Sequence, residues 1–205
     1  MRAVRSLNPG GALVHYPGSP MLARMLMRAQ DRLIACELHE QAAAALRRSM
    51  GGDARAKSLR IDGWTALKAY VPPKERRGVV VIDPPFEEES DFARLPAALA
   101  EAHRKWATGI YLLWYPIKTR AGPDALARRC KRLAVPKMLR SELTVGEAGE
   151  RLRGSGLILV NPPWPLADEL ARLLPLLAEL LGRGKAGRFR LDWLSGERTP
   201  AAPRA

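Results

Sequence analysis

The segment Asp83-Pro84-Pro85-Phe86 carries the clearest chemical signal in the sequence. Two consecutive prolines remove two backbone amide donors and stiffen the chain, so the carbonyls before and between them stay free to accept hydrogen bonds. The carboxylate of Asp83 adds another acceptor, and Phe86 offers a flat aromatic face. Such a set would suit an amino group attached to a planar ring. The structural alternative is a rigid turn at the exit of a strand.

A second segment, Asn161-Pro162-Pro163-Trp164, repeats the pattern after an apolar run. We favour the first segment because of its expected position in the sheet. Asp83 follows two predicted strands that also end in acids, whereas Asn161 is expected on a hairpin at the sheet edge, away from the centre.

Three successive predicted strands end in an acid, at Glu37, Asp62 and Asp83. A carboxylate at a strand end can accept hydrogen bonds from a ribose diol or an exocyclic amine, and it can also cap the next helix. For Asp62, which Gly63 follows, the two roles are equally supported. For Glu37 a binding role is favoured, because the residue directly follows an apolar strand.

Periodicity and breakers place these residues on alternating strands and helices. Ser19 and Pro20 predict the start of the first helix. We expect strands at 33–37, 57–61, 78–82, 110–115, 138–145, 156–160 and 188–194, and helices at 21–28, 40–50, 64–70, 91–107, 123–133 and 166–181. The alternation predicts an α/β domain over 1–196 with a parallel sheet, an antiparallel hairpin at one edge and a disordered tail at 197–205. Ligands of such sheets bind at the carboxyl ends of the strands.

The segment at Asp83 resembles motif IV of the amino-group methyltransferases, which use S-adenosylmethionine. The chain as a whole resembles the bacterial ribosomal RNA large subunit methyltransferase J family. The matching stretches are Tyr16-Pro17-Gly18-Ser19-Pro20, Glu37-Leu38-His39, Asp62-Gly63, Arg76-Arg77-Gly78, Ile82-Asp83-Pro84-Pro85-Phe86-Glu87, Ala107-Thr108-Gly109, Leu113-Trp114-Tyr115-Pro116, Gly154-Ser155-Gly156 and Val160-Asn161-Pro162-Pro163-Trp164.

The resemblance implies a Rossmann-like class I methyltransferase that makes N6-methyladenine in 23S rRNA, protein-free or partly assembled. It implies that Ser19 lies near the cofactor, that Glu37 binds the ribose hydroxyls, and that Asp62 and Gly63 contact the adenine ring of the cofactor. It also implies that Asp83, beside the cofactor, and the carbonyl of Pro84 receive the target amine, and that Phe86 stacks on the extruded base. Two alternatives stay open: a truncated, inactive RNA-binding remnant, and a DNA adenine-N6 methyltransferase.

The sequence departs from the family at its beginning. The family has an N-terminal segment with histidines, then a first strand with a Gly-rich loop, and neither is found here. In the family's strand order that first strand sits between the strands ending at Glu37 and at Asp83. We expect a misplaced start codon and a longer reading frame upstream, and a truly truncated product is the alternative.

The chain is strongly basic, with 34 Lys and Arg against 21 Asp and Glu, a formal charge of +13. Such an excess indicates a polyanionic partner, usually nucleic acid. Residues 103–140 contain ten Lys or Arg and the single acid Asp124. A solvated helix face explains part of this cluster, and we interpret the rest as a phosphate-binding surface. The candidate RNA-binding residues are Arg104, Lys105, Arg128, Arg129, Lys131 and Arg132.

Several other classes of protein are disfavoured by composition. Two cysteines and three histidines show no metal-ligand spacing and no disulfide framework. No apolar run is long enough for a bilayer, and the first residues are not a secretory signal. We therefore expect a cytoplasmic monomer that binds neither metal nor membrane.

Overall fold

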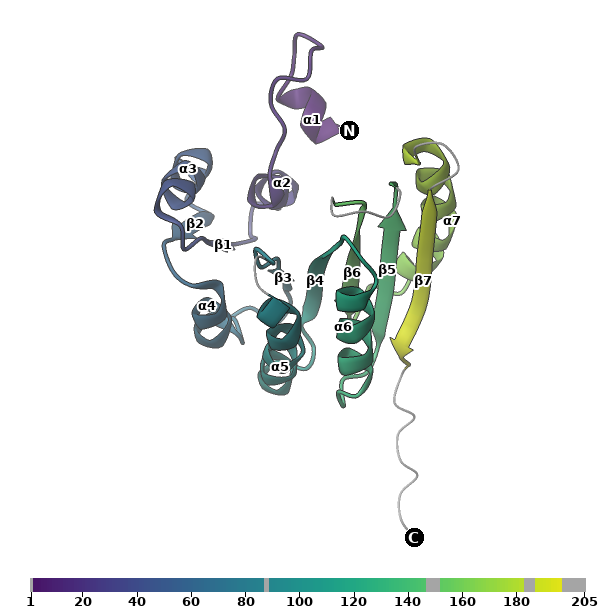
Figure 1. Cartoon of the computed structure of the whole chain (residues 1–205). Helices are drawn as coiled ribbons and strands as arrows, with labels where there is room; N and C mark the ends of the chain where they lie inside the picture. Colours follow the sequence, from purple (N-terminus) through teal and green to yellow (C-terminus); the bar gives the residue numbers. More distant parts are fainter. Residues whose placement is uncertain (1, 87–88, 147–151, 183–186, 197–205) are drawn as a thin grey trace. The chain divides into compact units, whose positions relative to one another are not determined.

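The computed structural model describes residues 2–86, 89–146, 152–182 and 187–196, so the expected disordered tail at 197–205 lies outside the described residues. The chain divides into two compact units, residues 1–69 and 70–205, and each is considered by itself. Figure 1 labels their helices and strands.

The first unit is built around a parallel pair of strands connected by a helix. Strand β1 pairs with β2 in the register Leu33↔Ala56 to Cys36↔Leu59. The connecting helix α3 is rich in alanine, and it packs on β2. The elements of the unit are α1 (Arg2–Ser6), α2 (Ser19–Leu26), β1 (Leu33–Cys36), α3 (Glu40–Met50), β2 (Ala56–Leu59) and α4 (Gly63–Tyr70).

The start of α2 differs from the expectation that Ser19 caps it. Ser19 is the first helical residue, and Gly18 takes the capping position without a side-chain hydrogen bond. The carbonyl of Gly18 accepts the first helical bond from Leu22, at 3.0 Å. Pro20 falls in the first turn, where its missing amide costs nothing. The short helix α1 was not predicted from the sequence.

The second unit is a five-stranded sheet in the order β3-β4-β6-β5-β7. Strands β3 and β4 are parallel, and the other three neighbouring pairs are antiparallel. The elements are β3 (Val79–Ile82), α5 (Glu89–Lys105), β4 (Ile110–Ile117), α6 (Ala121–Lys131), β5 (Met138–Thr144), β6 (Gly154–Val160), α7 (Leu166–Leu181) and β7 (Arg188–Ser195).

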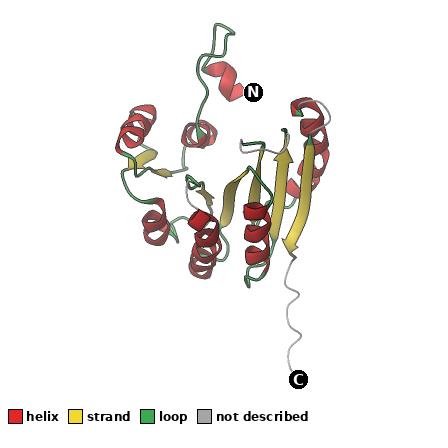
Figure 2. Ribbon diagram, in the orientation of Figure 1, coloured by secondary structure: helices red, strands yellow, loops and turns green. Residues whose placement is uncertain are grey.

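Helices cover the sheet of the second unit, and α6 and α7 lie on different faces of it (Figure 2). Helix α6 packs on β4 and β7, and α7 packs on β5 and β7. The core includes fully buried apolar side chains from α5, β4 and α6, such as Leu95, Leu99, Leu113 and Leu126.

The expected α/β class is confirmed, and so is the antiparallel hairpin, formed by β5 and β6. The position of that hairpin was predicted wrongly. Strand β6 is inserted between β4 and β5 and is the central strand of the five, while β7 forms the edge. Asn161, directly after β6, therefore does not lie at the edge of the sheet.

The sheet has two opposite ends that matter for function. The carboxyl ends of β3, β4 and β5, at Ile82, Ile117 and Thr144, point the same way, and we call this the Asp83 end. We call the opposite side, at the amino ends of the same strands, the Trp164 end of the sheet. Strand β3 is shorter than β4, and its last residue Ile82 pairs with Leu113 in the middle of β4. Strand β6 runs against them, and its last residue Val160 pairs with both Tyr111 and Met138. Asp83 thus lies level with Trp114 in the middle of β4, whereas Asn161 lies near the amino ends of β4 and β5.

The strands of the described residues fall into two separate sheets, which share no hydrogen-bonded strand pair. The resemblance places one further strand between the strand ending at Glu37 and the strand ending at Asp83. No such strand occurs in the part of the chain that the structure describes.

Candidate functional site

The carboxylates that follow β1 and β2 both accept hydrogen bonds from residues two or three positions further along the chain. Glu37 accepts the backbone amide of His39, just before α3, at 2.9 Å. Asp62 accepts both the backbone amide and the hydroxyl of Thr65, in the first turn of α4, each at 2.9 Å. The capping role that the sequence left open is therefore observed for Asp62, whereas Glu37 binds His39, the residue before the first turn of α3. Because β1 and β2 are parallel, Glu37 and Asp62 follow the same end of that small sheet.

The two small residues predicted to contact the cofactor lie at helix starts. Ser19 is the first residue of α2 and is exposed. Gly63 is the first residue of α4, and a Cβ built on it would have no neighbour within 4 Å. Packing therefore does not require a glycine at position 63, and the space beside it is open to a ligand.

Asp83 differs from the other two acids, because its carboxylate is not used by the fold. It is the first residue after β3, and no described residue donates a hydrogen bond to it or forms an ion pair with it. The residue is exposed, yet the surrounding protein removes part of its hydration and raises the pKa of the carboxyl above its ordinary value. An acceptor without a structural partner at the carboxyl end of a strand is available to a ligand.

Phe86 is held in an unusual backbone conformation behind the two prolines. Its φ is 53°, a left-handed value that is costly for an aromatic residue. Its ring is buried and contacts Phe92, with centroids 4.7 Å apart, and Trp114, at 5.9 Å. The ring is thus packed in an aromatic cluster, and its stacking on a base stays a prediction.

Asn161 has a structural function that separates it from Asp83. Its side-chain amide donates to the carbonyls of Ala107 and Gly109, both at 2.8 Å, and its backbone amide donates to Lys137 at 3.0 Å. Its φ of 53° is one that asparagine tolerates. This residue therefore joins the loop before β4 to the start of β5. The preference for Asp83 stands on this difference, since the reason taken from the sheet edge was wrong.

Replacing Asn161 with alanine is expected to lower the free energy of unfolding by about 1–3 kcal/mol, because two hydrogen bonds are lost and carbonyls are left without donors. Chemical denaturation measures the change. Asn161→Gly is the matched control, since it keeps the left-handed conformation accessible and removes only the hydrogen bonds. A folded, stable Asn161→Ala protein that has lost methyl transfer would instead place Asn161 in the reaction.

The candidate RNA-binding residues are all exposed, and they gather where two helices end. Helix α5 leads into β4 and α6 leads towards β5, so both helices end at the Trp164 end of the sheet. The residues are Arg104 and Lys105 on α5, Arg128, Arg129 and Lys131 on α6, and Arg132 directly after it. They lie towards the Trp164 end, whereas Asp83 follows the carboxyl end of β3, a separation that the sequence did not indicate.

Two other basic residues of the 103–140 cluster form ion pairs within the protein, so they are less available to RNA phosphates. Arg140 is only 3% exposed and binds Asp192 through two hydrogen bonds of 2.8 Å. Arg120 binds Glu142 at 2.6 Å and also pairs with Asp124. Its hydrogen bond holds the pKa of Asp124 below the ordinary value.

These pairs belong to a buried network that sequence reasoning missed. Glu142 is 2% exposed, and it accepts the hydroxyl of Tyr115 at 2.9 Å in addition to Arg120. Burial and the Glu142 carboxylate together raise the pKa of Tyr115. Gly156 belongs to the same arrangement, because a Cβ there would lie 2.2 Å from the Tyr115 ring. One signal was available: Arg140 and Glu142 are two apart in a strand and so share a face.

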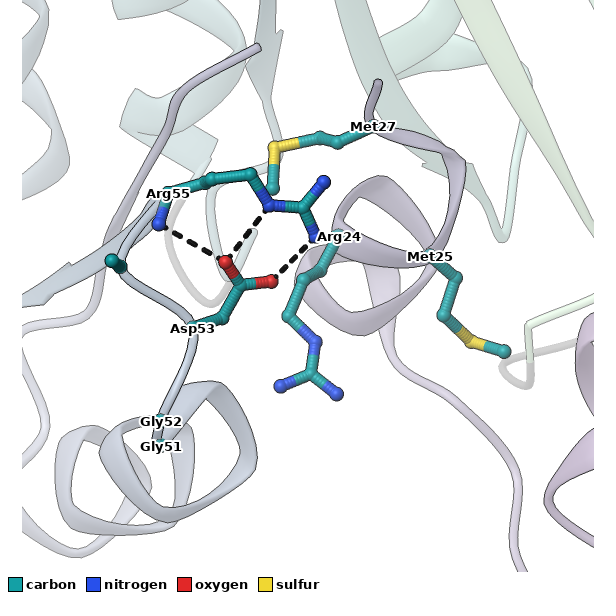
Figure 3. A pocket seen from close by; sticks show the side chains of 8 residues that line it. Arg24, Met25, Met27, Gly51, Gly52, Asp53 and Arg55 are labelled. Atoms are coloured by element: carbon teal, nitrogen blue, oxygen red, sulfur yellow. Dashed lines mark hydrogen bonds and ion pairs between the residues drawn. The ribbon is translucent and has the colours of Figure 1, made fainter. Parts of the chain in front are cut away.

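The first unit contains one open hollow, lined by residues from α2 and from the turn before β2 (Figure 3). The guanidinium of Arg55 is held there by Asp53, at 2.9 and 2.8 Å, and this bond lowers the pKa of Asp53 to about 2. Arg24 donates to the carbonyl of Ser49. The hollow lies at the amino end of β2, away from Glu37 and Asp62, so it is not the predicted cofactor site.

Within the described residues, no cluster of three or more His, Cys, Asp or Glu side chains is arranged to hold a metal ion. No described helix has the length and apolar character needed to span a bilayer.

Comparison with known proteins agrees with the fold and the motif. The family model described as "Ribosomal RNA large subunit methyltransferase D, RlmJ" matches residues 1–195. The ribosomal RNA large subunit methyltransferase J of Escherichia coli K12 is 37% identical over 199 residues, which cover 96% of this chain and 71% of the relative. The protein of the same name from Haemophilus influenzae is 34% identical over 200 residues, with the same coverage.

A solved structure shows the same architecture. A crystal structure of a protein from Legionella pneumophila superimposes with a TM-score of 0.88 at 30% identity, and the match covers 96% of this chain and 73% of that one. The fold is therefore the Rossmann-like α/β fold of class I methyltransferases. The chain belongs to the ribosomal RNA large subunit methyltransferase family RlmJ.

Proposed function

We propose that this protein transfers a methyl group from S-adenosylmethionine to the N6 amine of an adenine in 23S rRNA. Family membership supports the reaction and the class of substrate. Asp83 is the single observation that carries the proposal, because its carboxylate follows β3 and has no partner among the described residues. The acids after β1 and β2, in contrast, both accept hydrogen bonds from neighbouring residues.

The task of the site is to orient the amine. The lone pair of an adenine N6 amine is delocalised into the ring, which makes the nitrogen a poor nucleophile. Hydrogen bonds from the amine to Asp83 and to the carbonyl of Pro84 would draw the nitrogen towards tetrahedral geometry and localise the lone pair. S-adenosylmethionine supplies an electrophilic methyl group when bound. The residues of the chain then hold the nitrogen in line, and orientation supplies most of the acceleration.

The target adenine must leave its stack before it reaches Asp83. Extrusion costs a few kcal/mol, and the cost falls when the nucleotide is already unpaired. This favours rRNA that is protein-free or only partly assembled, which we propose as the substrate. We also propose that the protein acts as a cytoplasmic monomer.

We propose that Ser19, Glu37, Asp62 and Gly63 bind the cofactor, together with Asp83. Two features of the first unit support this assignment. Glu37 and Asp62 follow the same end of the β1–β2 pair, where a carboxylate oxygen can accept from a ribose hydroxyl or a ring amine. The space beside Gly63 admits a flat ring.

The test is methyl transfer with defined substrates. The protein is incubated with S-adenosylmethionine carrying a labelled methyl group and with either a 23S rRNA transcript or a DNA oligonucleotide of the same target sequence. Digestion and mass spectrometry should find N6-methyladenine in the RNA only. Transfer to DNA would contradict the RNA substrate, and a folded protein that binds RNA without transfer would be a non-catalytic RNA-binding protein.

A further inference from the structure

Trp164 is exposed to an extent that packing does not explain. Its exposed fraction is 89%, the largest among the large apolar side chains of the described residues. An indole left in water is unfavourable, and exposed aromatic side chains are often binding groups. Trp164 lies between Pro163 and Pro165, in the turn that leads from β6 into α7. Both neighbours have a restricted backbone, so the ring is presented from a rigid turn.

Asn161 attaches the turn that carries Trp164 to the neighbouring loops at this end of the sheet. Three hydrogen bonds connect Asn161 to Lys137 and to the loop at Ala107 and Gly109. Three extended residues span at most about 11 Å, so the Trp164 backbone lies within that distance of Asn161. The indole is therefore held close to the end of α5 and the start of β5.

The Trp164 end of the sheet also carries a concentration of positive charge. Residues 125–139 include five Lys or Arg and no acid, and the exposed side chains of Arg128, Arg129 and Arg132 lie at or just past the end of α6. Arg104 adds a further exposed cation at the end of α5. One basic residue in the last turn is common because it complements the helix dipole, but this concentration exceeds that need.

Acidic residues near Trp164 occur at the start of α7 and near the end of α5. Asp168 and Glu169 lie in the first turn of α7. Glu101 lies one turn before the end of α5 and pairs with Lys105 at 3.5 Å. A polyanion that reaches Trp164 would therefore extend towards the ends of α5 and α6 and away from α7. An exposed aromatic ring beside a row of cations is the arrangement that single-stranded nucleic acids require.

We propose that the Trp164 end of the sheet binds an unpaired segment of RNA, with one base stacked on Trp164 and the phosphates along the basic ends of α5 and α6. The register places Ile82 opposite Leu113 and Val160 opposite Tyr111, so Asp83 and Asn161 are about four residues apart along the strand direction, roughly 13 Å. The inference rests on the proposed function only for the identity of the natural RNA.

The experiment measures the binding of a fluorescein-labelled, unstructured RNA oligonucleotide to the whole protein by anisotropy over a range of salt concentrations. Trp164→Ala should weaken binding roughly tenfold, because one stacked base is lost. Trp164→Phe should restore most of the affinity. Neither change should alter the salt dependence, since no charge is removed. A duplex of the same sequence should not distinguish these variants, because its bases are already stacked.

The combined variant Arg128→Gln, Arg129→Gln, Arg132→Gln tests the phosphate contacts. It should lower the slope of log affinity against log salt by about 2, given ~0.7 for each phosphate contact to a single strand. Leu180→Ala is the matched control for Trp164→Ala, because it also shortens an exposed apolar side chain. Leu180 lies on α7, is 77% exposed and is distant from the basic cluster. It should change neither affinity nor slope.

Equal RNA affinity of Trp164→Ala and the unmodified protein, or an unchanged salt slope in the triple variant, would overturn the proposal. Trp164 would then be left to a protein partner and the cations to solvation. The result is independent of catalysis. A protein that transfers no methyl group but still needs Trp164 for RNA binding would refute the proposed function and leave this inference standing.

Discussion

Replacing Asp83 with alanine is expected to abolish methyl transfer to 23S rRNA and to leave the affinity for RNA nearly unchanged. The substitution removes an acceptor directed at one amine, and it removes no contact to phosphate. Loss of one hydrogen-bonding group that acts in the transition state costs about 100-fold or more. Since no described residue pairs with this carboxylate, the folded protein should be as stable as before. Labelled methyl transfer, RNA anisotropy and thermal unfolding measure the three quantities.

Asp83→Asn separates the roles of charge and acceptor. The amide keeps one acceptor oxygen, so partial activity is expected. In the unmodified protein, transfer should fall at low pH as the carboxyl is protonated, and the fall should begin above the pH expected of an ordinary aspartate, because desolvation raises the pKa of Asp83. The asparagine variant should lack this acidic limb. Full activity of Asp83→Ala, with Asn161→Ala inactive but folded, would show that the second Pro-Pro segment is the reactive one.

The apolar periodicity was sufficient to find the strands and helices, apart from α1, but not to locate where the helices end. Helices α5 and α6 begin and end two residues before the predicted limits. Trp106, just beyond α5, is buried and packs against the core. The apolar pattern therefore continues past the last hydrogen-bonded turn. A periodic pattern reports which side chains face the core, and the core includes loop residues.

Strand order was the part of the fold that local sequence could not supply. The spacing of residues 138–160 correctly indicated a hairpin, but it contained no information on which hairpin strand lies beside β4. Because β6 pairs with β4, Asn161 is placed next to the loop at Gly109 and not at a free edge. The parallel pairing of β3 with β4 places the end of α5 at the amino end of β4, whereas Asp83 follows the carboxyl end of β3. The chemistry that each residue could perform was predictable from the sequence, but the distances between these residues in the fold were not.

The capping of Asp62 was foreseen as one of two alternatives, because an aspartate before Gly63 is typical of a helix start. The burial of Phe86 was not foreseen. Its ring contacts Phe92 of α5 and Trp114 of β4, which lie 6 and 28 positions further along the chain. Contacts over such separations leave no signal in the four residues of the motif itself. The sequence therefore identified the acceptors at Asp83 more securely than the aromatic platform.

Replacing Glu142 with alanine is expected to lower the free energy of unfolding of the second unit by about 3–5 kcal/mol, the usual cost of removing one partner of a buried ion pair. The change leaves the hydroxyl of Tyr115 without its acceptor and Arg120 paired with Asp124 alone, and it removes the carboxylate 3.9 Å from the buried Arg140. Urea denaturation followed by far-UV circular dichroism measures the loss.

Tyr115→Phe is the matched control for this network. It removes one hydrogen bond to Glu142 and keeps both charges paired, so its cost should be only about 1 kcal/mol. Gly156→Ala tests the packing side of the same arrangement, since its Cβ would overlap the Tyr115 ring. If Glu142→Ala cost no more than Tyr115→Phe, the paired charges would contribute little, and packing against the Tyr115 ring would be the main constraint on β4, β5 and β6.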